Sequence, residues 1–136
     1  MVRESLEGLH AIAKEEIFKC GQVDAAEWPA CGAAGELLKR LREAFVGARR
    51  GLKRMGDWAA VPIEPDSQTR LCDASMAVRG VVCCGVPGAG GEDAVVALVI
   101  AGSVTHLQEM WQHWKEARVL PMLVSQDPRG LVLHEK

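Results

Sequence analysis

Apolar residues recur at three- and four-residue steps along the first half of the chain, a pattern typical of helices with one buried face. The first such helix is expected from Ser5 to about Cys20, with Gly21 as its end. The residues from Val23 to Gly32 show no period and are expected to form a loop. A second helix is expected from Ala33 to Met55, closed by Gly56. Its apolar stripe consists of Leu37, Leu38, Leu41, Phe45, Ala48, Leu52 and Met55.

The second half of the chain alternates short apolar runs with one more helical pattern. Two prolines in the run from Val61 to Pro65 favour extended backbone, and a short helix is expected from Asp66 to about Arg79. The β-rich runs from Val81 to Gly85 and from Ala94 to Ile100 predict two buried strands. A third long helix should begin near Gly102. Its expected buried residues are Leu107, Met110, Trp111 and Trp114.

The end of the chain reads as two last strands around a turn. They are expected from Val119 to Val124 and from Leu131 to Glu135, on either side of the turn from Asp127 to Gly130. Pro121 cannot donate a hydrogen bond to a neighbouring strand, so its strand should lie at an edge.

Composition narrows the class of protein. With 136 residues and 49% hydrophobic residues, the chain can bury one core, so residues 1–136 are expected to form a single domain. A net charge of −2 gives no signature of nucleic-acid or membrane binding. No apolar run approaches the ~20 residues of a membrane span and no signal core opens the chain, so a cytoplasmic location is expected. The five cysteines form no Cys-x-x-Cys pair, which favours reduced thiols and no metal site.

Basic residues gather on the expected helix from Ala33 to Met55, on the arc opposite its apolar stripe. They are Lys39, Arg40, Arg42, Arg49, Arg50, Lys53 and Arg54. One interpretation is a solvated helix face. The other is that residues near Arg49 to Arg54 reach an anionic ligand or a partner domain.

The segment from Gly85 to Asp93 is unusually rich in glycine, with four glycines between positions 85 and 91. Glycine permits positive φ and close approach of a ligand, so consecutive amides can converge on a phosphate. The segment is no dinucleotide fingerprint, because a strand and not a helix follows. It is no P-loop either, because Gly91 and Glu92 stand where Lys and Ser or Thr are required. An ordinary connection between two strands remains the alternative.

Two runs of this sequence resemble a known family. The segments from Val61 to Asp73 and from Gly80 to Ala94 are similar to the C-terminal region of plant and fungal phosphomevalonate kinases, within the galactokinase, homoserine kinase and mevalonate kinase superfamily. The segment from Val119 to Leu131 is similar to the ending of the plant enzymes. With the basic helix included, the resemblance covers about two thirds of the chain.

The resemblance implies a two-domain kinase of the mevalonate pathway to isoprenoids, which transfers the γ-phosphoryl group of ATP to 5-phosphomevalonate with Mg²⁺. The ATP-binding loop and the catalytic Lys and Asp of this superfamily belong to an N-terminal domain that the chain is expected to lack. No catalytic residue is therefore assigned here. The chain alone is expected to be inactive, to hold no tightly bound cofactor, and to self-associate through the face that normally meets the missing domain. The implied fold is an α+β, ferredoxin-like domain whose antiparallel sheet of about four strands carries helices mainly on one face.

The residues implied to bind phosphate or substrate belong to the glycine-rich loop: Gly85, Pro87, Gly88, Ala89, Gly90, Gly91 and Asp93. Supporting roles are expected for Glu64, Arg49, Arg50 and Arg54, whereas Gln68, Thr69 and Asp73 are expected to serve as scaffold. For Glu64 and Asp93 two roles stay open: a cap or turn partner that holds the loop, or direct help with Mg²⁺ or substrate. Glu92 departs from the aromatic residue of the relatives, and its carboxylate should point away from phosphates or meet an arginine. Replacing Gly90 with valine is expected to leave the protein folded.

Two other functions stay open. The chain could be a free-standing regulatory module that binds a phosphate-bearing metabolite without turning it over. Alternatively, it could be an interaction domain that docks an acidic partner on the basic helix, residues 33–55.

Overall fold

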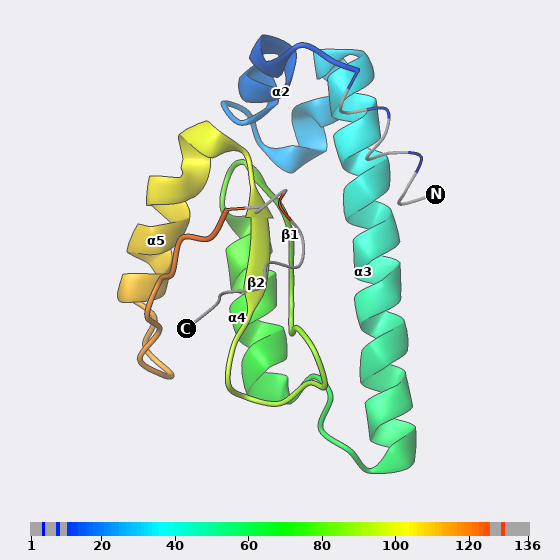
Figure 1. Cartoon of the computed structure of the whole chain (residues 1–136), viewed down its shortest axis with the longest axis vertical. Coiled ribbons are helices and arrows are strands. Elements are labelled where there is room, and N and C mark those ends of the chain that lie inside the picture. Colours follow the sequence, from blue (N-terminus) through cyan, green and yellow to red (C-terminus); the bar gives the residue numbers. More distant parts are fainter. Residues whose placement is uncertain (1–3, 5–7, 9–10, 126–128, 130–136) are drawn as a thin grey trace.

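The computed structural model describes residues 11–125 together with Glu4, Gly8 and Arg129. It confirms the α+β class (Figure 1). In chain order the elements are α2 (Lys14–Cys20), the 3₁₀ helix η1 (Ala25–Cys31), α3 (Ala33–Ala59), α4 (Asp66–Ala77), β1 (Val81–Gly85), β2 (Val96–Val99), the 3₁₀ helix η2 (Ala101–Ser103) and α5 (Val104–Gln112). Within the described residues, no helix is both long and apolar enough to cross a membrane.

The long helix α3 continues past the glycine that was expected to close it. It runs through Gly56 and ends at Ala59, and the cap residue Ala60 has a left-handed φ of 55°. A Cβ at Gly56 would lie 2.6 Å from the carbonyl oxygen of Val61. Gly56 therefore lets the chain fold back closely against the last turn of the helix, and the prediction of a stop at this residue was wrong.

The expected loop from Val23 to Gly32 instead contains the helix η1. The backbone N–H of Asp24 donates to the carboxylate of Glu27, with 3.1 Å between N and Oε2, which helps to fix the start of η1. Trp28 is fully buried, and its indole N–H donates to the carbonyl of Cys20 over 2.9 Å. The aromatic ring was counted as part of an aperiodic stretch, although it anchors this end of the molecule.

The strands β1 and β2 pair antiparallel, with Cys84 opposite Ala97 and Gly85 opposite Val96. All of β1 is buried, because it contacts both α3 and α4. The prediction that the second strand is also buried was wrong, since Val96 and Leu98 of β2 are about half exposed. Residues of β1 contribute to two cores. One core gathers Trp28, Leu38, Leu41, Val82 and Ile100, and the other gathers Cys72, Met76, Val81, Cys84 and Leu107, with Ala97 and Val99 of β2 packed against it.

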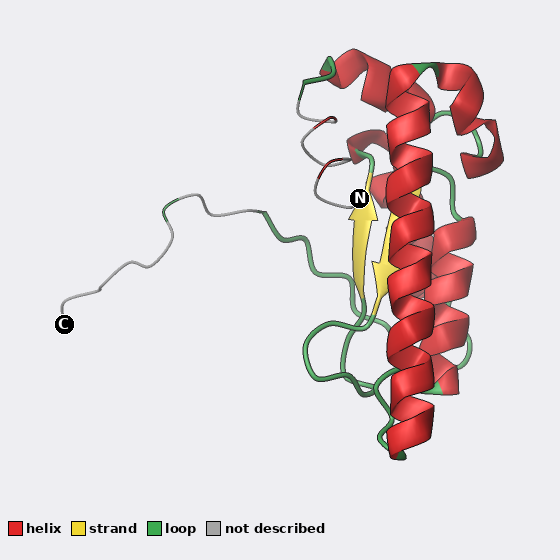
Figure 2. Cartoon of the chain, turned by 90° about the vertical axis from the view of Figure 1, so that its right-hand side faces the viewer, coloured by secondary structure: helices red, strands yellow, loops and turns green. Residues whose placement is uncertain are grey.

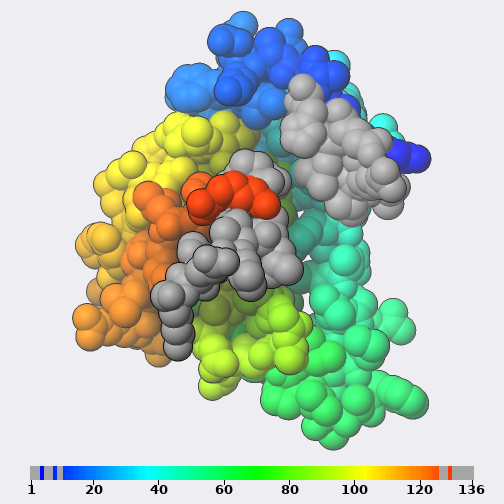
Figure 3. Space-filling model, viewed as in Figure 1, coloured from blue at the N-terminus to red at the C-terminus, as the bar shows by residue number. Residues whose placement is uncertain are grey.

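The sheet of about four strands is not confirmed, since the described residues form two strands. The prediction of a strand from Val119 to Val124 was wrong. This segment has no regular structure, passes over the surface after α5 (Figure 3), and leads away from the helices and strands (Figure 2). Pro121 offers no amide to a ladder, and the apolar side chains around it lie in solvent. The expected strand from Leu131 to Glu135, and most of the turn before it, lie outside the described residues.

Other expected boundaries shift less. The helix α2 begins only at Lys14, because residues 11–13 are not helical, so the prediction of one continuous helix from Ser5 was wrong. It ends at Cys20 with Gly21 as its cap, as predicted. The helix α5 ends at Gln112, so Trp114 lies beyond it and is half-buried. All five cysteines are free thiols and four are buried. Burial raises the pKa of Cys20 and of Cys83 to about 11, so both thiols stay protonated at neutral pH.

Candidate functional site

The glycine-rich segment forms the connection between β1 and β2, and three of its glycines have left-handed backbone. Their φ angles are 64° at Gly88, 90° at Gly90 and 109° at Gly91. Pro87, Gly88 and Ala89 are exposed, and we call these three residues the tip of the loop. Gly90 and Gly91 are half-buried. The tip is therefore accessible to a ligand, and the two glycines that follow it are only partly accessible.

Those two glycines rest on the backbone of Ile63. The N–H of Gly91 donates to the carbonyl of Ile63 over 3.1 Å, and the N–H of Gly90 donates to that of Pro87 over 3.3 Å. A Cβ at Gly90 would lie 2.4 Å from the carbonyl oxygen of Ile63. No side chain fits there without movement of backbone, so this geometry argues against the expectation that Gly90→Val leaves the protein folded.

The start of α4 holds the other side of the loop. The side-chain amide of Gln68 donates to the backbone carbonyl of Glu92 over 2.7 Å. The hydroxyl of Ser67 donates to the carboxylate of Glu92, with 2.9 Å between Oγ and Oε1. Glu92 therefore meets a serine and not an arginine. Gln68 acts as the scaffold that the resemblance implied, whereas the contact of Ser67 was not foreseen.

Glu64, next to Ile63, is almost fully buried and forms a two-pronged ion pair with Arg49 of α3. The distances are 2.9 Å from Nε to Oε2 and 2.7 Å from Nη2 to Oε1. Thr69 Oγ1 donates to Oε1 over 2.9 Å, and Arg49 Nη2 also reaches Asp73 Oδ1 at 2.9 Å. The two expected supporting residues are thus brought together, and Thr69 and Asp73 are part of their scaffold.

Both members of this pair are charged at neutral pH. Burial raises the pKa of Glu64, but the hydrogen bonds from Arg49 and Thr69 outweigh it, so the net pKa lies below its ordinary value. The hydrogen bond to Glu64 is also the largest influence on Arg49 and raises its pKa. A buried carboxylate that accepts three side-chain hydrogen bonds is costly to displace.

Two more basic residues of α3 face the body of the molecule, which the sequence did not reveal. Lys53 Nζ donates to the backbone carbonyl of Glu64 over 2.9 Å and meets Asp66 Oδ1 at 2.8 Å. Arg42 donates to the carbonyls of Val81 and Met76 over 2.7 and 2.6 Å. The spacing in the sequence predicts that these residues share one side of the helix. Steps of seven and four separate Arg42, Arg49 and Lys53, which is the helical period.

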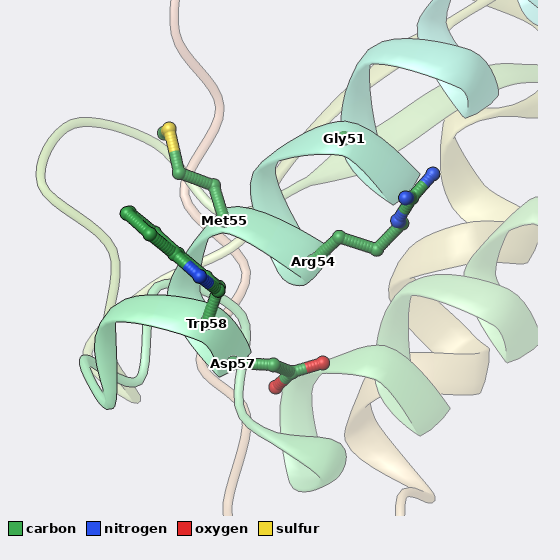
Figure 4. Close-up of a pocket in the computed structure, with 5 residues that line it drawn as sticks. All are labelled: Gly51, Arg54, Met55, Asp57 and Trp58. Atoms are coloured by element: carbon green, nitrogen blue, oxygen red, sulfur yellow. The ribbon is translucent and has the colours of Figure 1, made fainter.

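The remaining supporting candidates, Arg50 and Arg54, are exposed and pair with no residue that the structure describes. Arg54 borders a surface hollow at the end of α3, in which Met55 and Trp58 project to one side and Arg54 and Asp57 to another (Figure 4). Arg50 borders a second hollow, between η1 and the first half of α3. Neither arginine is joined to the glycine-rich loop.

The chemistry of the loop is that of backbone donors. Within the described residues, the amides of Gly88 and Ala89 have no protein acceptor. Arg49 and Lys53 already meet carboxylates, and within the loop itself the exposed amides at the tip are donors available to an anion. Such donors suit phosphate oxygens. Asp93 is exposed. No group of three His, Cys, Asp or Glu among the described residues could hold a metal ion by itself, so a Mg²⁺ ion here would take most of its ligands from phosphate oxygens and water.

Comparisons with known proteins support the resemblance. No family model and no solved structure matches the chain. Over 123 residues, or 86% of the chain, it is 40% identical to the peroxisomal phosphomevalonate kinase of Arabidopsis thaliana. The chain is related to the phosphomevalonate kinases. Those of Gibberella zeae and Candida albicans are 36% and 39% identical over 72% and 53% of the chain.

The matched region is only part of each relative. It spans 24% of the length of the Arabidopsis phosphomevalonate kinase, 23% of the Gibberella kinase and 17% of the Candida kinase. The name of the plant relative places that protein in the peroxisome, so the cytoplasmic location expected for the present chain stays a prediction.

Proposed function

We propose that this chain is the C-terminal part of a phosphomevalonate kinase and that the tip of its glycine-rich loop binds the reacting phosphates. In this proposal the complete kinase transfers the γ-phosphoryl group of ATP to 5-phosphomevalonate. The observation that carries it is the exposed tip, where the amides of Gly88 and Ala89 lack a protein acceptor on a loop that α4 and Ile63 hold in place.

The role of the tip is electrostatic. During phosphoryl transfer, charge is spread over the nonbridging oxygens of the moving group, and fixed donors that need no rearrangement stabilise that charge well. The N–H groups of Gly88 and Ala89 would donate to those oxygens. Mg²⁺ bound with ATP would neutralise phosphate charge, and none of the described residues is assigned to hold it. No group here is assigned to move a proton.

Exposed apolar side chains support the proposal that more polypeptide covers this region. Leu52, Met55 and Trp58 of α3 are 43%, 51% and 89% exposed, and Val96 and Leu98 of β2 are nearly half exposed. Grouped apolar surface of this kind commonly marks an interface. The proposed occupant is the ATP-binding domain of the complete kinase, and the chain alone should self-associate there. The ferredoxin-like layout of the superfamily remains part of the proposal.

A coupled assay with ATP, Mg²⁺ and 5-phosphomevalonate tests the function. The complete kinase should produce ADP only when 5-phosphomevalonate is present, and the 136-residue chain alone should show no turnover. By calorimetry, the isolated chain should bind phosphate with millimolar or weaker affinity, because each exposed amide contributes only about 1 kcal/mol. Turnover by the isolated chain would overturn the proposal that the catalytic residues lie in another domain. An inactive complete kinase would overturn the proposed function.

The two alternative functions have less structural support. Docking of an acidic partner on α3 would use its basic face, which is reduced because Arg42, Arg49 and Lys53 are bonded within the domain. The basic residues of that face that stay exposed are Lys39, Arg40, Arg50 and Arg54. A regulatory module that binds a phosphate metabolite predicts micromolar binding by the isolated chain, which the same calorimetry would detect.

A further inference from the structure

We propose that Arg49 and Glu64 are positioning residues for the proposed phosphoryl transfer: their ion pair sets where the tip of the glycine-rich loop stands, without touching the phosphates. The inference rests on the proposed function, because it assigns a consequence for turnover to a contact that lies beneath the loop.

The first step is the short path from the ion pair to the loop. Glu64 is joined to Arg49 by two hydrogen bonds of 2.9 and 2.7 Å. The preceding residue, Ile63, accepts the hydrogen bond from Gly91, and its backbone is the surface on which Gly90 rests. A shift of Glu64 therefore moves the support of both glycines, which directly follow the tip.

The second step is that this support has one orientation. Both carboxylate oxygens of Glu64 are occupied, by Arg49 and Thr69, and its backbone carbonyl accepts from Lys53. The planar guanidinium of an arginine matches a carboxylate only in a fixed fork, which a lysine cannot reproduce. A buried ion pair often adds little net stability. What this pair contributes is a fixed orientation of Glu64.

The third step is that the loop is fixed at its base while two amides at its tip have no acceptor. Gln68 and Ser67 hold Glu92, and Gly91 is held by Ile63, whereas the amides of Gly88 and Ala89 have no acceptor among the described residues. Donors on such a support are preorganised, the condition under which amides lower a barrier most.

The test compares Arg49→Lys and Glu64→Gln with a matched control, Glu116→Gln. Glu116 forms a similar pair with Arg70, with Nε to carboxylate distances of 3.0 and 2.8 Å, but that pair is exposed and forms no hydrogen bond or ion pair with the described residues of the loop. If Glu64→Gln fails to fold, Thr69→Val removes one hydroxyl donor to Glu64 and leaves the arginine fork in place.

Two readouts separate this inference from the proposed function. Backbone amide NMR of the chain should show shifted Gly88, Ala89 and Gly91 signals in Arg49→Lys and Glu64→Gln but not in Glu116→Gln. In the complete kinase, assayed well below its unfolding temperature, the first two variants should lower kcat by about 10-fold or more with KM for ATP nearly unchanged. A displacement of only 1 Å can cost ~100-fold in rate.

The outcomes are distinct. Unmoved loop signals, or moved signals with unchanged kcat in an active kinase, would overturn the positioning role. Signals that move equally in Glu116→Gln would show a general loss of structure, and would also overturn it. An inactive wild-type kinase would overturn the proposed function, and the inference about turnover with it.

Discussion

The two halves of α3 are stabilised in different ways although one apolar stripe runs along both. In the first half, Ala34, Leu38 and Leu41 are buried in the core around Trp28. In the second half, Leu52 and Met55 continue the stripe but are about half exposed. There the helix is held by Arg49 and Lys53, which pair with Glu64 and Asp66.

The difference shows that the same periodic pattern can serve two purposes. In the first half it fills the core of this chain, and in the second half it stays on the surface beside the loop that is proposed to act. Polar contacts allow the second half to be fixed in orientation without its apolar side chains. Those side chains are then left for the surface that the rest of a longer kinase is proposed to cover.

The two tryptophans give the largest expected contrast. Trp28→Ala removes a fully buried ring and its hydrogen bond to Cys20, and should lower the free energy of unfolding by about 3–5 kcal/mol. Trp58 is 89% exposed, so Trp58→Ala should change it by less than about 0.5 kcal/mol. Urea denaturation of both variants measures the contrast. Equal losses would mean that the end of α3 is packed after all.

The next largest contrast is expected between two glycines of the loop, in the stability that each loses when it is replaced by alanine. Gly90→Ala combines a left-handed backbone, at about 1–2 kcal/mol, with a Cβ forced into Ile63, at about 1–3 kcal/mol. Gly88→Ala carries only the first cost, because nothing lies within 4 Å of its Cβ. In thermal unfolding, the melting temperature of Gly90→Ala should therefore be clearly lower than that of Gly88→Ala. The reverse order would contradict the packing of the loop on Ile63.

The smallest of these effects is a dependence on pH. The pKa of Glu64 is lowered in the folded protein, so its stabilisation is present above the ordinary pKa and is lost as the pH falls through the lowered value. At pH 7, Glu64→Gln should lower the free energy of unfolding by about 1–3 kcal/mol. This difference from wild type should shrink below about pH 4. A difference that stays constant down to pH 2 would mean that the carboxylate charge is not what holds Ile63.

Local pattern was enough to predict most elements of the fold. The helices α3 and α4, the strand β1 and the core of β2 follow from spacing and β-rich composition. The local sequence pattern could not reveal η1, because a short 3₁₀ helix has no long apolar period and Trp28 is fixed by tertiary contacts. It also could not show that Val119 to Val124 would lack a partner strand, since pairing depends on an edge elsewhere in the molecule.

For the site, composition identified the glycine-rich loop but not what supports it. Arg42, Arg49 and Lys53 looked like the rest of the basic helix face, and only the fold shows that they point toward α4. The contact of Gly90 with Ile63 depends on a backbone approach that no sequence pattern encodes. Arg50 and Arg54 are arginines of the same helix as Arg49, and yet their side chains remain in solvent.

The most direct test of the central claim is the turnover number of the complete kinase with Gly88→Ala, compared with Gly32→Ala. Both glycines have positive φ and open space around their Cβ, but Gly32 lies between η1 and α3, outside the loop. If the tip meets the reacting phosphates, the methyl group at Gly88 should lower kcat by about 100-fold, the scale of a lost transition-state donor, while Gly32→Ala keeps its rate. Equal rates in the two variants would show that the loop is only a connection between β1 and β2.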